Sequence, residues 1–401
     1  MRRIIIIVSL LLTLVMLGGC LGCSVFSKRE PYHSDEELEA EYGYRSLTDE
    51  EKEFYRKVDA YIYAPQSLPF TASRKLELDR MSEIIDIFIS DHPEIFWIDE
   101  EYNFETIGYV GDKYLISLDY AIENDVREAG IDAMKGAVES FLKTVPEGAD
   151  DYEKELCINS WIIENCMYDD EAAEQEAEQN VYAVGHEHMA YGVLVDGKAV
   201  CDGYARAFKL LCDKVGLECV IISGDTEDSA HAWNAVKIMD SWYYVDVTWN
   251  DNDDFEDCEA ERYLYLNMTE EMISADHVIA PLYSDKGDYE AIFYNYYLPE
   301  CDSEEYNYFE RTYFKVSSED ELSLLPEKIA EAAKEKADCF CFSVSDDLNY
   351  NDLFRKLYNG DAWDLLRQAN SINGGDPQLN VSPYLFQFPQ TRGILLLLEY
   401  V

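Results

Sequence analysis

The sequence of 401 residues predicts an α+β protein in which amphipathic helices pack against an antiparallel sheet. In several segments apolar residues recur every three or four positions, which is typical of helices that bury one face. Two strand-like segments, 231–238 and 242–249, are joined by a short connection, which indicates an antiparallel hairpin. The clearest helical segments are 49–64, 73–90, 123–144 and 151–165.

Residues 51–145 are expected to form a small α+β region. Pro93 ends the helix predicted over 73–90, because proline disfavours the helical conformation of the residue before it. The apolar run that follows, up to Ile98, is predicted to form a strand, and a second strand is predicted over 113–120.

Residues 146–280 are expected to form the core of the protein. The segment 169–180 is acidic and has no clear periodicity, so we expect a loop there. A helix is predicted from Asp202 to Gly216, since a glycine commonly ends a helix, and a strand follows over 218–223.

Residues 281–401 begin with a tyrosine-rich stretch and continue as a small α/β region. Strand-like and helix-like patterns alternate there. The predicted elements are strand 311–317, helix 325–337, strand 338–344, helix 351–370 and strand 384–400.

The composition is strongly acidic, with 82 Asp and Glu against 32 Lys and Arg and a formal net charge of −50. Nucleic acid is therefore an unlikely partner, because phosphate binding needs a basic surface. Surface charge would also not hold the protein to anionic lipid. Hydrophobic residues make up 48% and aromatic residues 13% of the chain, which is enough for a folded core and excludes disorder.

The N-terminus has the pattern of a secretory signal. Two arginines precede the apolar run 4–17, which is shorter than the ~20 residues that a spanning helix needs. The run ends in Gly-Gly-Cys and resembles the bacterial lipoprotein signal, in which the cysteine, here Cys20, is lipidated. We expect a signal peptide over 1–19, a polar tether over 20–50 and a lipid anchor on the extracytoplasmic face of a bacterial cell membrane. An ordinary cleaved signal without lipid is the alternative.

Three residues could carry nucleophilic chemistry. Cys201 lies at the predicted start of a helix, where the helix dipole favours a thiolate and unpaired backbone N–H groups can stabilise an oxyanion. His231 and Asp246 lie on the two strands of the predicted hairpin. Cysteine catalysis needs a thiol, an imidazole that takes its proton and a third group that orients the imidazole.

The register of the hairpin leaves the orienting residue open. A two-residue turn at Asp240 puts His231 opposite Asn250. A turn centred two residues earlier, or a bulge, puts it opposite Asp246 instead. Periodicity does not choose between these registers, so Asn250 and Asp251 remain alternatives to Asp246.

Three motifs carry a resemblance to a known family. The runs GKAVCDGYARAF at 197–208, HAWN at 231–234 and WYYVDVTWN at 242–250 resemble the transglutaminase-like superfamily, in its bacterial extracytoplasmic lipoprotein branch. The resemblance implies a papain-like core over 146–280, with the nucleophile helix packed on an antiparallel sheet and smaller α/β regions on either side.

The resemblance also implies residue roles. Cys201 corresponds to the nucleophile, His231 to the general base and acid, and Asp246 to the orienting carboxylate, which favours Asp246 over the alternatives. Papain-like enzymes carry a glutamine six residues before the nucleophile to complete the oxyanion hole. In this sequence Val195 occupies that position, so the oxyanion contributor stays unassigned.

The implied function is that of a membrane-anchored surface enzyme that transfers acyl groups through a cysteine thioester. It would hydrolyse or transamidate amides of protein or peptide substrates, including cationic or amine-bearing ones. The alternative is a surface binding or scaffold lipoprotein that keeps the fold with weak or no turnover. No cofactor and no metal is expected: His186 and His188 have the spacing of metal ligands, but the sequence suggests no third ligand nearby.

Overall fold

The computed structural model describes residues 29–65, 69–98, 105–117, 122–179, 185–227, 229–252, 260–282 and 295–401. The predicted signal peptide and Cys20 lie outside these ranges. The chain divides into two compact units, Met1–Phe88 with Ile98–Asn124, and Ile89–Trp97 with Asp125–Val401. Within the described ranges, no helix combines the length and the apolar character that crossing a membrane requires. The domain boundaries expected after residues 50, 145 and 280 stay predictions.

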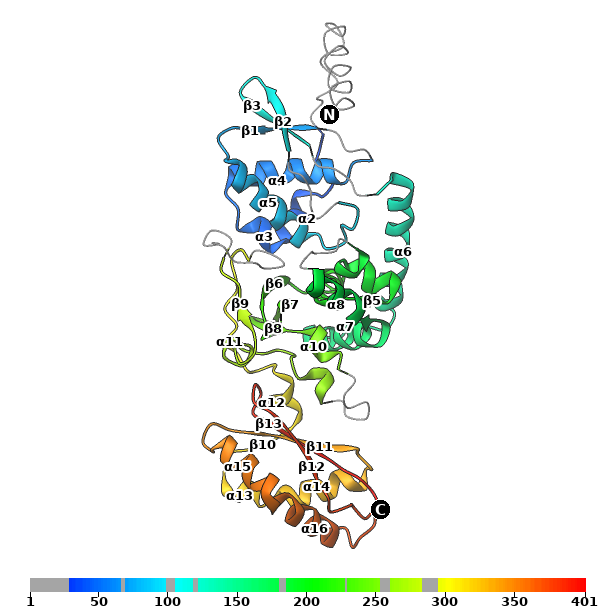
Figure 1. The fold of residues 1–401 in the computed structure, drawn as a ribbon, viewed down its shortest axis with the longest axis vertical. Coiled ribbons are helices and arrows are strands. Elements are labelled where there is room, and N and C mark those ends of the chain that lie inside the picture. Colours follow the sequence, from blue (N-terminus) through cyan, green and yellow to red (C-terminus); the bar gives the residue numbers. More distant parts are fainter. Residues whose placement is uncertain are drawn as a thin grey trace. The chain divides into compact units, whose positions relative to one another are not determined.

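The first unit contains helices and a three-stranded antiparallel sheet in the order β1-β3-β2 (Figure 1). Helix α4 begins at a capping box, in which Thr48 and Glu51 satisfy each other's backbone N–H groups. The elements are α2 (Asp35–Ala40), α3 (Tyr42–Arg45), α4 (Asp49–Ile62), β1 (Phe70–Ser73), α5 (Leu78–Asp91), β2 (Glu105–Val110) and β3 (Lys113–Ser117).

Two predictions for this region were wrong. The helix predicted from residue 73 begins only at Leu78, because Ser73 still pairs with β3 as the last residue of β1 and a turn follows it. The strand predicted after Pro93 is a turn followed by irregular chain, although Ile95, Phe96 and Trp97 are buried as a strand would bury them. An apolar run indicates that a segment is buried, but a buried segment can be either a strand or irregular chain.

The core of the second unit places a helix against a four-stranded antiparallel sheet. The sheet order is β8-β7-β6-β9 (Figure 1). Helix α9 packs against β6, β7 and α7. This is the expected papain-like arrangement of nucleophile helix and antiparallel sheet. The elements are α6 (Asn124–Leu142), α7 (Asp151–Asn165), β4 (Met167–Tyr168), α8 (Asp170–Gln179), β5 (Lys198–Ala199), α9 (Cys201–Val215), β6 (Cys219–Asp225), β7 (Ala230–Ile238), β8 (Ser241–Val245), α10 (Val247–Asn250), α11 (Glu270–Ile273) and β9 (Val278–Ile279).

The acidic segment predicted as a loop is a helix, α8 (Asp170–Gln179). Its sequence, DEAAEQEAEQ, carries no apolar stripe, so hydrophobic periodicity could not find it. Alanine, glutamate and glutamine nevertheless favour helix intrinsically, and this preference was the signal that the prediction missed.

Gly224 on β6 lets two backbones approach closely. An added Cβ at this position would lie 2.0 Å from the carbonyl oxygen of Val278 and 2.6 Å from the indole of Trp233. Gly224 pairs with Ile279 of β9, so the short edge strand β9 depends on this glycine for its distance from β6.

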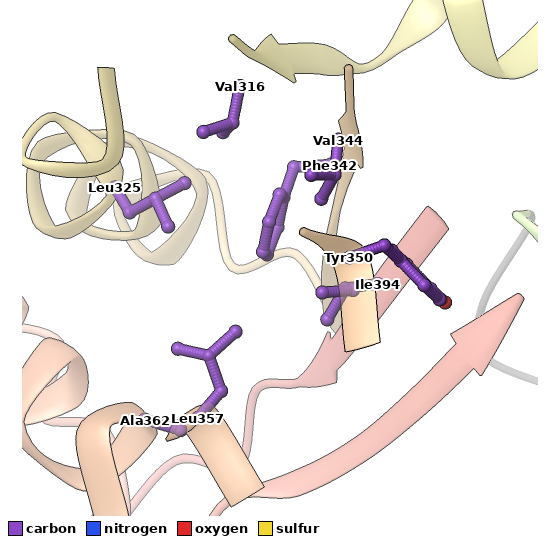
Figure 2. Close-up of a cluster of buried hydrophobic side chains, with 8 residues drawn as sticks. All are labelled: Val316, Leu325, Phe342, Val344, Tyr350, Leu357, Ala362 and Ile394. Atoms are coloured by element: carbon purple, nitrogen blue, oxygen red, sulfur yellow. The ribbon is translucent and has the colours of Figure 1, made fainter. Parts of the chain in front are cut away.

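The C-terminal region forms a four-stranded sheet in the order β10-β11-β13-β12, covered by helices. Only the β10–β11 pair is parallel in this described sheet. In the core of the region, Phe342 projects its ring between Leu325 and Leu357 (Figure 2). The elements are α12 (Tyr308–Thr312), β10 (Phe314–Val316), α13 (Glu319–Leu322), α14 (Leu325–Lys334), β11 (Cys339–Val344), α15 (Tyr350–Lys356), α16 (Ala362–Ile372), β12 (Tyr384–Phe388) and β13 (Gly393–Leu397).

Two C-terminal elements differ from their predictions. The single strand expected over 384–400 is a hairpin, because the chain turns between Phe388 and Gly393. The helix expected over 351–370 is interrupted at Gly360, whose φ of 148° is not helical.

Candidate active site

Cys201 is the first residue of α9 and lies against β7. The helix starts there, so the backbone N–H groups of its first turn have no acceptor within the helix. The backbone N–H groups of Asp202 and Ala232 bond to the thiol, and Ala232 directly follows His231 on β7. The thiol therefore lies against β7 at the residue that follows His231.

His231 is hydrogen-bonded to Asp246. Its Nε2 lies 2.7 Å from Oδ2 of the carboxylate, and both side chains are buried. Burial opposes ionisation of Asp246, but the charges and hydrogen bonds of His231 and His277 hold the pKa of this carboxyl well below its usual range. Asp246 is therefore a carboxylate, which can only accept, and Nε2 of His231 donates to it. Nδ1 is then the imidazole nitrogen that remains for the Cys201 thiol.

The position of Asp246 is set by where the second strand of the hairpin, β8, ends. The register pairs Asn234 with Val245, and the turn is formed by Met239 and Asp240, so neither of the two turns considered from the sequence occurs. β8 stops at Val245 because Asp246 becomes the N-cap of α10. Its Oδ1 accepts the backbone N–H of Trp249 at 3.1 Å, which leaves Oδ2 for His231.

The two alternatives to Asp246 have other partners. Asn250 donates to Oδ1 of Asn159 and accepts the backbone N–H of Tyr265. Asp251 accepts the hydroxyl of Tyr204. The structure brings neither of them to His231.

The environment of Cys201 differs from the expectation of a thiolate. Burial raises the pKa of the Cys201 thiol, and the neighbouring charge of Asp202 raises it further. The backbone N–H groups of Ala232 and Asp202 act in the opposite direction. The thiol is therefore protonated at rest, and its ionisation requires a base such as His231.

His277 is a site residue that the sequence reasoning missed. Its Nε2 lies 3.1 Å from Oδ2 of Asp246, the oxygen that also binds His231, and its Nδ1 lies 2.6 Å from Oδ1 of Asp276. Burial disfavours the charged imidazole, but the bonds to Asp246 and Asp276 raise the pKa of His277 to about 9. The sequence signal was the pair Asp276-His277 in front of the short strand β9.

Aromatic rings surround the two histidines. The ring of Trp249 lies 4.5 Å from that of His277 and 5.7 Å from that of His231. The ring of Trp233 lies 4.9 Å from that of His277. These rings keep water away from the polar groups, which strengthens the electrostatic interactions among them.

The same cluster has the composition of a metal site. His231, Asp246 and His277 each place a ligand atom within 4.8 Å of the other two. Two imidazoles and a carboxylate suit Zn²⁺, but a metal on Nε2 of His231 would displace the proton that this nitrogen donates to Asp246. Metal binding here would therefore compete with the Cys-His-Asp arrangement. His186 and His188 do not form a pair of ligands, since they bond to different carboxylates, Asp196 and Asp202.

A cleft of about 750 Å³ opens beside His231. Three carboxylic acids line it, and none of the lining residues in the described part of the chain is Lys or Arg. Cys201 is 7% exposed and is not a lining residue, so His231 is the residue of the three candidates that lines the cleft. The lining residues are Tyr168, Asp170, Thr226, Ser229, His231, Thr248, Trp249, Asp251, Asn252, Glu261, Leu264, Tyr265 and Phe388.

Comparisons with known proteins show what the core is similar to. Residues 141–247 match the sequence model of the Transglutaminase-like superfamily. The kyphoscoliosis peptidases of Mus musculus and Homo sapiens are each 28% identical to this chain over 137 residues, which covers 31% of this chain and 20% of the peptidase. The chain thus spans about a fifth of the length of these curated relatives.

Two solved structures are also similar. A TGase crystal structure is 17% identical, covers 46% of this chain and 52% of its own, and has a TM-score of 0.28. A candidate cysteine protease from Cytophaga hutchinsonii is 16% identical, covers 34% of this chain and 52% of its own, and has a TM-score of 0.23.

The helix-on-sheet core and the buried His–Asp pair beside a helix-start cysteine define a papain-like domain of the cysteine-enzyme type. Within that class, residues 141–247 are similar to the Transglutaminase-like superfamily.

Proposed function

We propose that this protein is a cysteine acyl-transfer enzyme, with Cys201 as nucleophile, His231 as general base and acid, and Asp246 as the orienting carboxylate. The observation that carries the proposal is the buried hydrogen bond of 2.7 Å between His231 and Asp246, next to the start of α9. A third group that orients an imidazole beside a thiol is the arrangement that nucleophilic catalysis requires.

The reaction follows from the protonation states of the site. Nδ1 of His231 takes the proton of the Cys201 thiol as the sulfur attacks an amide or ester carbonyl. The first-turn N–H groups of α9 stabilise the developing oxyanion, and the imidazolium returns the proton to the leaving group. Water or an amine then resolves the thioester, which gives hydrolysis or transamidation.

The cleft supports a preference for cationic or amine-bearing substrates. Its lining includes the carboxyl groups of Asp170, Asp251 and Glu261. A cleft lined by one sign of charge raises the local concentration of the opposite sign. Lysine-rich protein or peptide is the substrate class that this charge fits.

We also propose that the enzyme works on the extracytoplasmic face of a bacterial membrane, held by lipid on Cys20. The support is the signal-like run 4–17 followed by Gly-Gly-Cys, together with the net charge of −50, which would not itself hold the body to anionic lipid. Metabolic labelling with a clickable fatty acid tests the anchor. Label that persists in Cys20→Ser would contradict it.

The central experiment measures the alkylation of each cysteine of the full chain by iodoacetamide, read by mass spectrometry. Cys201 should react at least about tenfold faster than the other cysteines, and His231→Ala should abolish this advantage. His186→Ala is the matched control, because His186 also bonds to an aspartate but lies away from Asp246. Equal rates at all cysteines would overturn the proposal.

A second measurement separates the two fates of the thioester. A reporter amine and candidate peptides are incubated with wild type and with Cys201→Ala. Incorporation of the amine indicates transamidation, and cleavage without incorporation indicates hydrolysis. If wild type does neither, the scaffold alternative gains support, which the burial of Cys201 and the presence of Val195 in place of a glutamine already favour.

A further inference from the structure

We propose that His277 is a positioning residue of this site: it holds Asp246 for His231 and links that carboxylate, through Asp276, to Gln390 of the C-terminal region. The inference rests on the proposed function, because it assigns to His277 the support of the carboxylate that orients His231.

The hydrogen bonds of His277 define its charge. Both ring nitrogens contact carboxylates, Nε2 with Asp246 at 3.1 Å and Nδ1 with Asp276 at 2.6 Å, and the side chain is fully buried. A carboxylate only accepts hydrogen bonds, so both nitrogens must donate, and only the imidazolium carries two N–H groups. The raised pKa of His277, about 9, agrees with this geometry.

An imidazolium on this side of Asp246 changes what Asp246 does for His231. The carboxylate shares its Oδ2 between two histidines. The bond from His277 fixes the position of this oxygen, so the oxygen stays directed at Nε2 of His231.

The far side of His277 reaches the C-terminal sheet. Oδ2 of Asp276 accepts Nε2–H of Gln390 at 2.5 Å and the hydroxyl of Tyr265 at 2.7 Å. Gln390 lies in the turn between β12 and β13, and Phe388 at the end of β12 lines the cleft. The C-terminal hairpin thus contributes both to the wall of the cleft and to the hydrogen-bond chain behind the triad.

The titratable groups around His277 are few among the described residues. Asp246, at the end of β8, and His231, on β7, lie on one side, and Asp276 and the phenol of Tyr265 lie on the other. The remaining ring contacts are the uncharged indoles of Trp233 and Trp249.

Two substitutions of His277 test its bond to Asp246 and its bond to Asp276 separately. In His277→Gln the amide can still donate to Asp246 from the place of Nε2, without the charge. In His277→Asn the shorter amide can replace Nδ1 toward Asp276 but does not reach Asp246. The readout is the rate of alkylation of Cys201 in the full chain, followed from pH 5 to pH 10.

His277→Gln should keep the alkylation rate within about threefold of wild type, because its amide still donates to Oδ2 of Asp246. His277→Asn should lower the rate by about tenfold or more, because Asp246 loses its support. Gln390→Ala should lower the rate by a smaller amount, because it removes a bond to Asp276 and leaves His277 in place. The proposal is overturned if both His277 variants keep the wild-type profile, or if both lower the rate equally at all pH values.

Asn295→Ala is the matched control. Its buried amide bonds to Ser223 and to the carbonyl oxygen of Ala280, and it makes no contact with Asp246. The shape of its pH profile should be that of wild type.

A separate measurement decides on His277 even if Cys201 proves unreactive and the proposed function fails. Histidine resonances are followed by NMR in Cys201→Ala. A buried histidine that shows N–H protons on both ring nitrogens at pH 7, and whose resonances are absent in His277→Gln, supports the proposal. A His277 ring with a single N–H proton at pH 7 overturns it.

Discussion

His231 reaches Asp246 across 2.7 Å although the two residues are not opposite each other in the β7–β8 hairpin. The carboxylate meets the imidazole because the chain leaves the sheet at Val245 and turns into α10. One oxygen of Asp246 caps that helix and the other accepts from His231. The short helix α10 therefore directs the carboxylate of Asp246 toward His231.

Asp246→Asn should remove function without removing the fold. Asparagine is as good an N-cap as aspartate, so α10 should persist. The neutral amide no longer favours the proton on Nε2 of His231, and the alkylation rate of Cys201 should fall by about 10²–10⁴-fold. Asp251→Asn is the control and should alter this rate little. An unchanged rate in Asp246→Asn would show that Asp246 does not orient His231.

Zinc should inhibit the site reversibly. Micromolar Zn²⁺ should slow the alkylation of Cys201 by occupying His231, Asp246 and His277, and EDTA should restore the rate. Mg²⁺ at the same concentration should have no effect, because it prefers an octahedral shell of oxygen ligands. His277→Gln should weaken the inhibition by about tenfold or more, since one ligand is lost. Equal inhibition of this variant and wild type would place the zinc elsewhere.

The stability of the protein should fall as the pH rises through the neutral range, because of Glu155. Burial raises the pKa of this fully buried carboxyl to about 8 from 4.5, and the bond from Asn267 opposes the shift. The folded state therefore binds a proton that the unfolded state releases, so stability is lost between about pH 4.5 and pH 8.

Glu155→Gln removes this titration. Above pH 8 the variant should be more stable than wild type, on the order of 1–4 kcal/mol, and near pH 5 the two should be similar. Urea unfolding at both pH values measures the difference. The exposed Glu164→Gln on the same helix is the control, and a pH-independent difference for Glu155→Gln would contradict this account.

The acidic cleft should discriminate by substrate charge. Asp170→Asn combined with Glu261→Gln should lower kcat/KM for a lysine-rich peptide by about 3–10-fold and leave a neutral peptide nearly unaffected. Added salt should reduce the wild-type preference and not that of the double variant. Asp364→Asn, on the exposed surface of α16, is the control. A double variant with unchanged preference would mean that the cleft does not select charge.

Much of the core could be predicted from local patterns. Apolar periodicity identified α4, α6, α7 and α9, and the motifs identified Cys201 at the start of a helix. The choice of Asp246 needed the resemblance to a family, because it depends on where β8 ends. That end is set by the N-cap of α10, which competes with continuation of the strand through residue 249.

His277 could not be predicted in the same way. It lies 31 residues after Asp246 and just before a strand of two residues, whose pairing with β6 is a tertiary contact. No local periodicity marks so short an edge strand. The contact of Gln390 is harder still to predict from the sequence, since its partner Asp276 is 114 residues away in the chain.

Gly224 is a position outside the lining of the cleft at which a substitution would alter the site. Any side chain there would meet the carbonyl oxygen of Val278 and push β9 outward, and His277 is the residue directly before that strand. A single-base change of the glycine codon to one for alanine or serine would thus displace His277 while leaving Cys201, His231 and Asp246 unchanged in the sequence. If the proposed function holds, inherited loss of activity would arise in a gene whose codons for these three residues are all unaltered.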